Sequence, residues 1–342
     1  MERQYTKIRK TLKKIGISVD PAINQLLINY VEKKHQPLVK HQMSSGGKRI
    51  RPALAILTYK MLGGKGKDIL TSASGLEILH NYTLIIDDII DHSLIRRNIP
   101  TVWKKFGKSI AQSLEMAYSG AILEASAKSK YPAKVAMVYA EALKMIGDGE
   151  IFDILFEQAG REDEDYITKN RFQKVTNKDY FKMAGKKTAI LLQSSCEVGG
   201  ICADATKEDI SRLKKFGFNI GLAFQIQDDI LDIFGDEKTI GKKIGGDIIE
   251  RKLGNIIMVI FAQKASKQDV KKLADTLKKK EIKNEDIKQV VELINKTNAK
   301  QEAEKLSQKF TTIAKKQLKF LPQNIWNNEL SELADFIINR KY

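Results

Sequence analysis

The chain has 342 residues, of which 42% are hydrophobic, so it is long enough for a large core and too apolar for a disordered protein. Its formal charge of +17 suits an anionic partner, but no zinc-finger, RNA-binding aromatic or leucine-zipper pattern is present, and we expect no nucleic-acid partner. The polar N-terminus, the lack of an 18-residue apolar run and the presence of only Cys196 and Cys202 predict a cytoplasmic protein with no transmembrane segment and no disulfide framework.

The proline distribution indicates a helical protein. No proline occurs between residues 133 and 321, and proline breaks helix interiors. Alternating strand patterns joined by Asn-Gly or Asp-Gly turns are absent, and no linker or change in composition marks a boundary. We therefore predict an all-α fold that forms a single domain over residues 1–342.

The first basic motif is Gly46-Gly47-Lys48-Arg49-Ile50-Arg51-Pro52, which precedes a predicted helix that ends at Gly63-Gly64. The motif places three cations after a flexible glycine pair. Helix starts favour anions, and arginine binds phosphate oxygens with two parallel donors. The motif predicts a phosphate site, with an ordinary basic loop as the alternative.

The next predicted helix carries Asp87-Asp88-Ile89-Ile90-Asp91 after the apolar residues Leu84 to Ile86. Positions i and i+4 share one helix face, so Asp87 and Asp91 point the same way. Mg²⁺ prefers oxygen ligands and often bridges carboxylates to phosphates. The pattern predicts a site for metal and phosphate, whereas an exposed acidic patch is the alternative for one such motif alone. His80 lies two turns earlier on the same face, and Arg96-Arg97 follow.

Further along, Lys187-Thr188 is predicted to start a helix that continues through Ile190 to Cys196. Glu162-Asp163-Glu164-Asp165 is predicted to be an exposed loop. Residues 218–234 form one long apolar helix in this interpretation, and it carries a second motif, Asp228-Asp229-Ile230-Leu231-Asp232. Lys242 and Lys252 follow. If the two acidic helices face each other, their carboxylates line both walls of one cavity.

Taken in order, these motifs resemble the trans-polyprenyl diphosphate synthases, and within that family the archaeal short-chain enzymes. The resemblance rests on GGKRIRP (46–52), HNYTLIIDDIIDHSLIRR (80–97), KKTA (186–189), FQIQDDILDIFGD (224–236) and GKKIGGD (241–247). It implies a helical bundle of the isoprenoid synthase type around a central cavity, a homodimer, and condensation of isopentenyl diphosphate with allylic diphosphates. It also implies Mg²⁺ as the cofactor, with about three ions per active site.

The resemblance also assigns roles to individual residues. It implies that Asp87, Asp88, Asp91, Asp228, Asp229 and Asp232 bind metal. The allylic diphosphate would contact Arg96, Lys187, Thr188, Gln225, Lys242 and Lys252, with Lys243 as the alternative to Lys242. Isopentenyl diphosphate would bind to Lys48, Arg51, His80 and Arg97. The catalytic set would be Asp87, Asp88, Asp91, Arg96, Lys187 and Asp228.

Product length is expected to depend on Tyr82 with its neighbour Thr83. Tyr82 stands five positions before Asp87, about 7.5 Å deeper along the helix. A large side chain there would close the tunnel that receives the growing product, and an ordinary core aromatic is the alternative. The resemblance implies geranylgeranyl diphosphate as the product, with farnesyl diphosphate as the alternative.

Three other kinds of protein share some of these features. A non-catalytic synthase subunit would usually lose acidic or basic motif residues, all of which are present. A class I terpene cyclase would need no isopentenyl site, against which Lys48, Arg51 and Arg97 argue. A nucleic-acid-binding protein is supported by the charge alone. The basic surface also suggests peripheral contact with an anionic membrane, through which an apolar product could be delivered.

Overall fold

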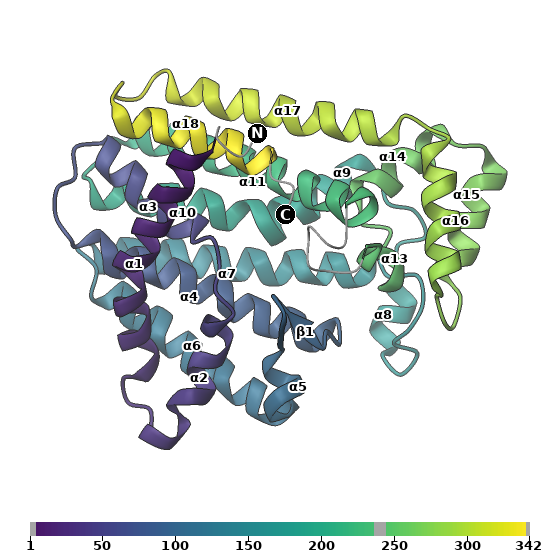
Figure 1. Ribbon diagram of the computed structural model, residues 1–342, viewed down its shortest axis with the longest axis horizontal. Helices are drawn as coiled ribbons and strands as arrows, with labels where there is room; N and C mark the ends of the chain where they lie inside the picture. Colours follow the sequence, from purple (N-terminus) through teal and green to yellow (C-terminus); the bar gives the residue numbers. More distant parts are fainter. Residues whose placement is uncertain (1–4, 236–243, 340–342) are drawn as a thin grey trace. The chain divides into compact units, whose positions relative to one another are not determined.

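The computed structural model describes residues 5–235 and 244–339, and Figure 1 shows that helices dominate this part of the chain. The all-α prediction is confirmed. The elements up to residue 127 are α1 (Thr6–Ile28), a 3₁₀ turn η1 (Lys33–His35), α2 (Gln36–Ser44), α3 (Ile50–Met61), α4 (Ile69–Ile90), β1 (Ile95–Arg96), β2 (Ile99–Pro100), α5 (Val102–Phe106) and α6 (Lys108–Ala127).

The remaining elements follow the same pattern of helices and short connections. They are α7 (Pro132–Leu155), α8 (Asp165–Asn170), α9 (Asn177–Ala184), a π-helical turn η2 (Gly185–Ala189), α10 (Ile190–Cys202), α11 (Lys207–Phe234), α13 (Gly246–Ile249), α14 (Ile256–Lys264), α15 (Lys267–Leu277), α16 (Asn284–Asn295), α17 (Ala299–Leu318) and α18 (Ile325–Ile338).

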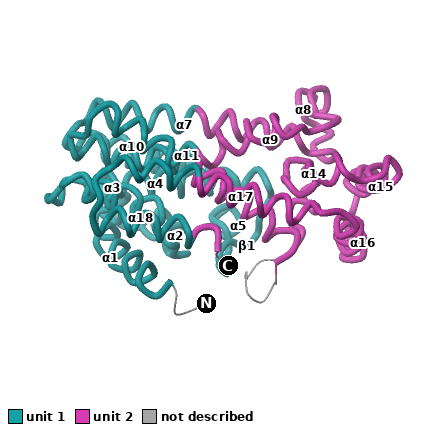
Figure 2. Tube along the Cα trace, turned by 90° about the horizontal axis from the view of Figure 1, so that it is seen from above, with its two compact units in different colours: residues 1–144, 190–218, 313–336 teal, residues 145–189, 219–312, 337–342 magenta. Residues whose placement is uncertain are grey.

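The chain forms two compact units, coloured separately in Figure 2. Unit 1 comprises residues 1–144, 190–218 and 313–336, and unit 2 comprises residues 145–189, 219–312 and 337–342. The division falls inside α7, α11 and α17 rather than in linkers. The single domain expected from the sequence stays a prediction.

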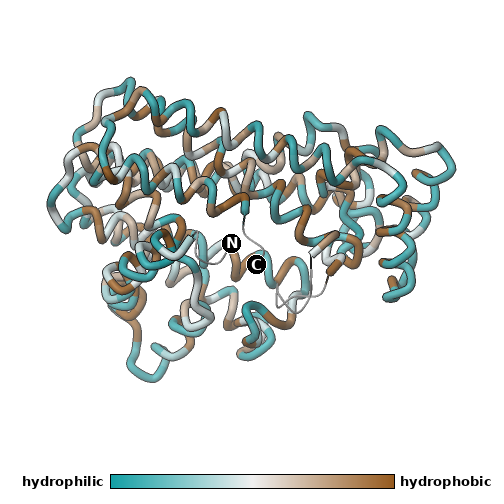
Figure 3. Tube along the Cα trace, turned by 45° about the horizontal axis from the view of Figure 1, so that its top comes forward, coloured by the Kyte–Doolittle hydropathy of each residue, from teal (hydrophilic) through white to brown (hydrophobic). Residues whose placement is uncertain are grey.

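In unit 1, α4 is the central helix. It packs against α1, α3, α6 and α10, and its buried side chains include Leu76, Ile78, Leu79 and Ile85. Figure 3 colours the chain by hydropathy, with apolar residues in brown along many of the helices. A helix that is apolar on most of its surface belongs in a protein interior. Burial on all sides fixes α4 in place, so the acidic residues at its C-terminal end have a rigid support.

In unit 2, α14 has the corresponding central position. Residues Ile256 to Phe261 are all buried, and α14 packs against α9 and α16. Asn255 caps this helix, since its side chain accepts a hydrogen bond from the Ile257 amide. A buried and capped helix gives this unit a fixed frame beside the second acidic motif.

Several helix predictions are confirmed. Pro52 lies in the first turn of α3, which ends at Met61 just before Gly63, whose φ is 90°. Residues 218–234 are helical, although α11 begins earlier, at Lys207. The acidic stretch from Glu162 is exposed as expected, but its last residue, Asp165, starts α8.

The predicted helix start at Lys187 is wrong. Lys187 lies within the turn η2, which joins α9 directly to α10. The helical run starts instead at Thr176, whose side chain forms a reciprocal capping box with Asp179. No proline interrupts residues 177–202, so the chain stays helical and absorbs one wide π turn where Lys187 and Thr188 stand.

A small hairpin, β1–β2, also departs from the purely helical prediction. Its turn residues Arg97 and Asn98 have φ values of 50° and 65°, as a type I′ turn requires. Each strand has two residues, too few to give an alternating pattern in the sequence. Both cysteines are buried in α10. Among the residues the structure describes, no helix is both long and apolar enough to cross a membrane.

Candidate functional site

The first acidic cluster consists of Asp87, Asp88 and Asp91 at the C-terminal end of α4, in unit 1. The Asp91 amide donates to the carbonyl of Asp87 over 2.8 Å, so the predicted spacing of one helical turn is confirmed. Asp87 and Asp91 are half-buried, whereas Asp88 is only 1% exposed. Two carboxylates are thus accessible on one face, with the third behind them.

Asp88 holds Arg96, which the hairpin carries back towards α4. The Arg96 Nε donates to Asp88 Oδ1 over 2.8 Å, and a second guanidinium nitrogen lies 2.7 Å from the same oxygen. Burial works against the charge of Arg96, but Asp88, then Asp87 and Asp91, raise the pKa of its guanidinium above the usual value. A permanent cation is therefore fixed beside the acidic cluster.

The hairpin itself is braced from several sides. Trp103 Nε1 and Thr101 Oγ1 both donate to the carbonyl of Ser93, over 2.9 and 2.8 Å. The buried His41 lies with its Nε2 2.8 Å from the carbonyl of Pro100. These bonds fix the chain between the acidic cluster and α5, so Arg96 and Arg97 project from a rigid turn.

The glycine–arginine loop, residues 45–51, lies in the same unit. Gly46 and Gly47 have φ values of 78° and 150°, which other residues adopt with strain. A Cβ on Gly47 would lie 2.9 Å from guanidinium nitrogens of both Arg49 and Arg97. The Arg97 guanidinium donates to the carbonyl of Gly46. Glycine is therefore favoured here, chiefly by the backbone conformation and to a smaller extent by the two guanidinium groups that approach Gly47.

His80 joins this group from α4. Burial, and then the positive charges of Arg51, Arg97, Arg96 and Arg49, lower the pKa of His80 well below its usual value. The imidazole is therefore neutral at physiological pH. The predicted anion-binding residues Arg51, His80 and Arg97 thus share one electrostatic environment. Lys48 is exposed, and its Nζ lies 5.9 Å from the centre of the Phe336 ring.

Arg49 has a different task from the cations on either side of it. It is buried, its Nε donates to Asp20 over 3.0 Å, and its NH1 group donates to Glu77 over 3.1 Å. With a φ of 53° it is held in the left-handed region directly before α3. This ion triad ties the loop to α1 and α4, and sequence reasoning did not anticipate it because the partners lie far apart in the chain.

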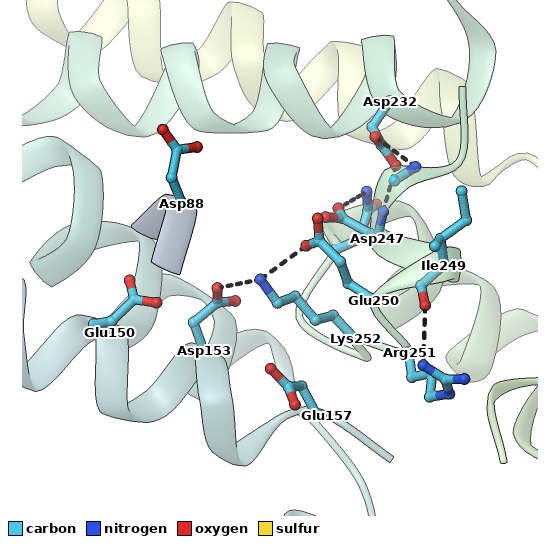
Figure 4. Close-up of polar contacts among 12 residues, drawn as sticks. Asp88, Glu150, Asp153, Glu157, Asp232, Asp247, Ile249, Glu250, Arg251 and Lys252 are labelled. Atoms are coloured by element: carbon cyan, nitrogen blue, oxygen red, sulfur yellow. Dashed lines mark hydrogen bonds and ion pairs between the residues drawn. The ribbon is translucent and has the colours of Figure 1, made fainter. Parts of the chain in front are cut away.

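The second acidic cluster consists of Asp228, Asp229 and Asp232 on α11, in unit 2. Asp228 is half-buried. Asp232 accepts hydrogen bonds from the amides of Gly246 and Asp247, over 3.0 and 3.1 Å, at the start of α13 (Figure 4). Part of this cluster therefore organises the chain that follows it.

Asp229 is the buried member of the second cluster. It accepts from the Ile256 amide over 2.9 Å and from Gln225 Nε2 over 2.8 Å. Burial and the nearby Asp247 raise the pKa of Asp229 well above its usual range, against the effect of these hydrogen bonds. Gln225 in turn accepts from Thr188 Oγ1 over 2.6 Å. The structure thus brings together Thr188, Gln225 and Asp229, all of which the sequence analysis selected.

Asp247 was not selected, although it lies in the GKKIGGD motif. Its carboxylate accepts from Asn255 Nδ2 over 2.8 Å. Its proximity to Asp229, evident in the raised pKa of that residue, makes it a fourth acidic side chain of the second cluster. The sequence signal that could have identified Asp247 is its acidic side chain, a short distance after the second acidic motif. Lys242 and Lys243 lie outside the described residues.

A third group, the lysine cluster, comprises Glu150, Asp153, Lys187, Glu250 and Lys252, all in unit 2. The Lys187 Nζ lies 2.6 Å from Glu150 Oε2 and 2.7 Å from Asp153 Oδ2. The Lys252 Nζ lies 3.0 Å from the same Asp153 oxygen and 2.9 Å from Glu250 Oε2 (Figure 4). The two predicted phosphate-binding lysines are therefore neighbours, joined through an acid that sequence reasoning missed.

A ready-made metal centre would need several ligating side chains that converge on one point. Within residues 5–235 and 244–339, no three or more acidic, histidine or cysteine side chains are arranged to hold an ion by themselves. The accessible carboxylates of the first cluster come as a pair. This is the donor set that Mg²⁺ uses when phosphates and waters complete its coordination, rather than an all-protein cage. The residues present therefore fit a metal that binds together with a phosphorylated substrate.

Known proteins are similar to this chain over most of its length. Residues 32–294 match the family described as polyprenyl synthetase. The geranylgeranyl diphosphate synthase of Saccharolobus solfataricus is 33% identical, covering 93% of this chain and 95% of that protein. The short chain isoprenyl diphosphate synthase of Methanocaldococcus jannaschii is 36% identical, covering 80% of each chain.

Solved structures agree with these relatives. The geranylgeranyl pyrophosphate synthetase of Pyrococcus horikoshii superposes with a TM-score of 0.82 at 28% identity, over 99% of each chain. A decaprenyl diphosphate synthase of Rhodobacter capsulatus superposes with a TM-score of 0.87 at 24% identity, also over 99% of each chain, and so shares the fold.

Proposed function

Because the chain belongs to the polyprenyl synthetase family and is a prenyltransferase, we propose that it condenses isopentenyl diphosphate with allylic diphosphates to give geranylgeranyl diphosphate. One observation carries this proposal. In unit 1 an accessible pair of carboxylates and an arginine-rich glycine loop are joined by one hairpin, through Arg96 on Asp88 and Arg97 on Gly46. Such a unit suits two anionic substrates, one bound through metal and one bound directly.

The metal role of the first cluster rests on the donor set. Asp87 and Asp91 would hold Mg²⁺, with about three ions per site proposed in all, and Asp228 would contribute from the second cluster. When bound, Mg²⁺ neutralises charge on the departing diphosphate. Asp88 stands apart in this scheme because its Oδ1 is engaged by Arg96. We assign it mainly to holding that arginine.

The chain's own residues would act by binding and orienting charge. Arg96, Lys187, Thr188, Gln225 and Lys252 would bind the allylic diphosphate as its C–O bond breaks, an electrostatic stabilisation of the kind that dominates many enzymes. Arg51, His80, Arg97 and Lys48 would hold isopentenyl diphosphate so that its double bond attacks the allylic cation. The neutral His80 would serve as a hydrogen-bonding group rather than as a cation.

Product length is proposed to depend on Tyr82 on α4. This side chain is half-buried, and Thr83 beside it donates from its hydroxyl to the carbonyl of His80 over 2.8 Å. Relatives at similar identity differ in name: Methanosarcina mazei has a geranylgeranyl and Aeropyrum pernix a geranylfarnesyl diphosphate synthase, each 29% identical. The twenty-carbon product is favoured because an aromatic side chain fills this position.

A homodimer is proposed from one exposed face of α6. Met116 and Leu123 are 72% and 67% exposed, seven positions apart, with Gly120 between them on the same side of the helix. Exposed apolar side chains grouped in this way are typical of interfaces. Light scattering on a Met116→Glu, Leu123→Glu variant tests the proposal, since a dimer formed there should dissociate. The cytoplasmic location and peripheral membrane contact stay predictions.

The condensation itself has a direct test. Purified protein is supplied with Mg²⁺, isopentenyl diphosphate and dimethylallyl, geranyl or farnesyl diphosphate in turn, and the products are separated by chain length. We expect a twenty-carbon diphosphate from each primer. A main product of fifteen carbons would favour the farnesyl alternative. No condensation with any primer would overturn the proposed activity and leave the non-catalytic subunit.

A further inference from the structure

The lysine cluster is an unbroken series of alternating charges in which one carboxylate occupies the centre. Ion pairs join Glu150 to Lys187 and Glu250 to Lys252, whereas Asp153 joins both lysines through a single oxygen. Asp153 is 7% exposed and Lys252 is 5% exposed. The ammonium groups of Lys187 and Lys252 are therefore held next to the same carboxylate oxygen.

A close contact at Gly149 and two backbone hydrogen bonds bring these residues together. A Cβ on Gly149 would lie 2.4 Å from the backbone nitrogen of Lys187, so this glycine lets α7 touch the π-helical turn. After α7, the Leu253 amide donates to Phe156 and the Gln158 amide donates to Arg251, which clamps the chain around Lys252. These backbone contacts therefore place both lysines beside Asp153.

The charge of Asp153 is secured by the lysines it joins. Burial opposes ionisation, but Lys187 and Lys252 outweigh it and hold the pKa of this carboxyl well below its usual range. A buried carboxylate between two ammonium groups offsets their mutual repulsion. Without it, the two cations would repel each other and separate or reorient.

We propose that Asp153 is a positioning residue that holds Lys187 and Lys252 together as one paired-cation anchor for the diphosphate of the allylic substrate. The inference rests on the proposed function of the two lysines and deepens it. Asp153 touches no substrate in this scheme. It acts by setting where the two ammonium groups stand, and so differs from Glu150 and Glu250, each of which restrains one lysine.

The test compares Asp153→Asn with Glu157→Gln. Glu157 lies four positions further along the chain and is similarly buried. Its side chain pairs with Arg161 over 2.8 Å, while its backbone forms a bridge with that of Lys252, which the substitution leaves in place. Steady-state kinetics should show a rise of about ten- to a hundredfold in KM for the allylic diphosphate in Asp153→Asn. The KM for isopentenyl diphosphate should stay within about twofold. Asp153→Glu, which keeps the charge, should recover part of the loss.

A second measurement separates this inference from the proposed activity. Inorganic diphosphate with Mg²⁺ should raise the melting temperature of the wild type and of Glu157→Gln, and raise that of Asp153→Asn much less. If the wild type condenses no primer, this binding comparison still decides whether Asp153 supports an anchor. Should Asp153→Asn fail to fold, Asp153→Glu is compared with Glu157→Gln in the same way, and a selective loss for the allylic substrate is expected. Equal changes for both substrates, or equal diphosphate shifts in Asp153 and Glu157 variants, would overturn the proposal.

Discussion

The two acidic clusters have the same sequence pattern but different surroundings. Both lie near a helix C-terminus, since Asp91 follows the last residue of α4 and α11 ends at Phe234, two residues after Asp232. In the second cluster, however, Asp232 also accepts hydrogen bonds from the amides that start α13. A helix C-terminus carries negative partial charge and disfavours carboxylates, whereas amides at a helix start favour them. The first cluster is therefore stabilised by added cations, while the second is already used in part by the fold.

The largest expected effect comes from removing one accessible carboxylate from each cluster. Asp87→Asn should lower kcat by about a thousandfold, because the metal-held diphosphate would lose its main support. Asp228→Asn should lower it by about ten- to a hundredfold, since that cluster supplies a further contact. Initial rates at saturating Mg²⁺ provide the measurement, with melting temperatures as the check on folding. The reverse order of losses would break the comparison.

A change within the first region should alter the product rather than the rate. Tyr82→Ala should shift the main product beyond twenty carbons, because the tunnel is expected to deepen by about one aromatic side chain. Chromatography of the hydrolysed products measures this shift. Tyr180→Phe, in unit 2, is the control and should leave chain length unchanged. Unaltered products from Tyr82→Ala would assign Tyr82 to core packing alone.

A smaller effect distinguishes the clusters by stability. Asp232→Asn should lower the free energy of unfolding by about 1 kcal/mol, since Asp232 caps backbone amides. Asp91→Asn should leave stability unchanged or raise it by about 0.5 kcal/mol, because a charge is removed from a helix C-terminus. Urea unfolding of the two variants tests the contrast, and equal destabilisation would contradict it.

The smallest expected effect is on how the free energy of unfolding depends on pH. His80 has a lowered pKa in the folded chain, whereas in the unfolded chain histidine titrates near about 6.5. Below that pH the unfolded state binds a proton that the folded state does not, so stability is lost as pH falls towards the folded pKa. His80→Gln should therefore weaken the decline in unfolding free energy between about pH 6.5 and 5. An unchanged decline would place its cause in other groups.

The sequence was informative where function depends on local spacing. The turn between Asp87 and Asp91 and the helix ending just before Gly63 could both be predicted, because period and backbone preference are local properties. The roles of Arg49 and Asp153 could not. Their partners come from distant segments, such as Asp20 for Arg49 and Lys252 for Asp153, and only the packed structure brings them together.

The π turn at Lys187 illustrates the same limit. Its residues have no unusual propensity, and its position follows from the close approach of Gly149 on α7. Glu150 and Asp153 are three residues apart on α7 and so share one helix face. That spacing alone does not show that both contact lysines.

The buried thiols of α10 have a practical consequence. Cys196 and Cys202 belong to unit 1, as do both tryptophans, Trp103 and Trp326. Burial raises the pKa of the Cys196 thiol to about 12, so it is unreactive until its surroundings open. Tryptophan fluorescence and thiol labelling therefore follow the unfolding of one unit only. The half of the molecule that carries the second acidic cluster and the lysine cluster needs an introduced reporter before its opening can be observed.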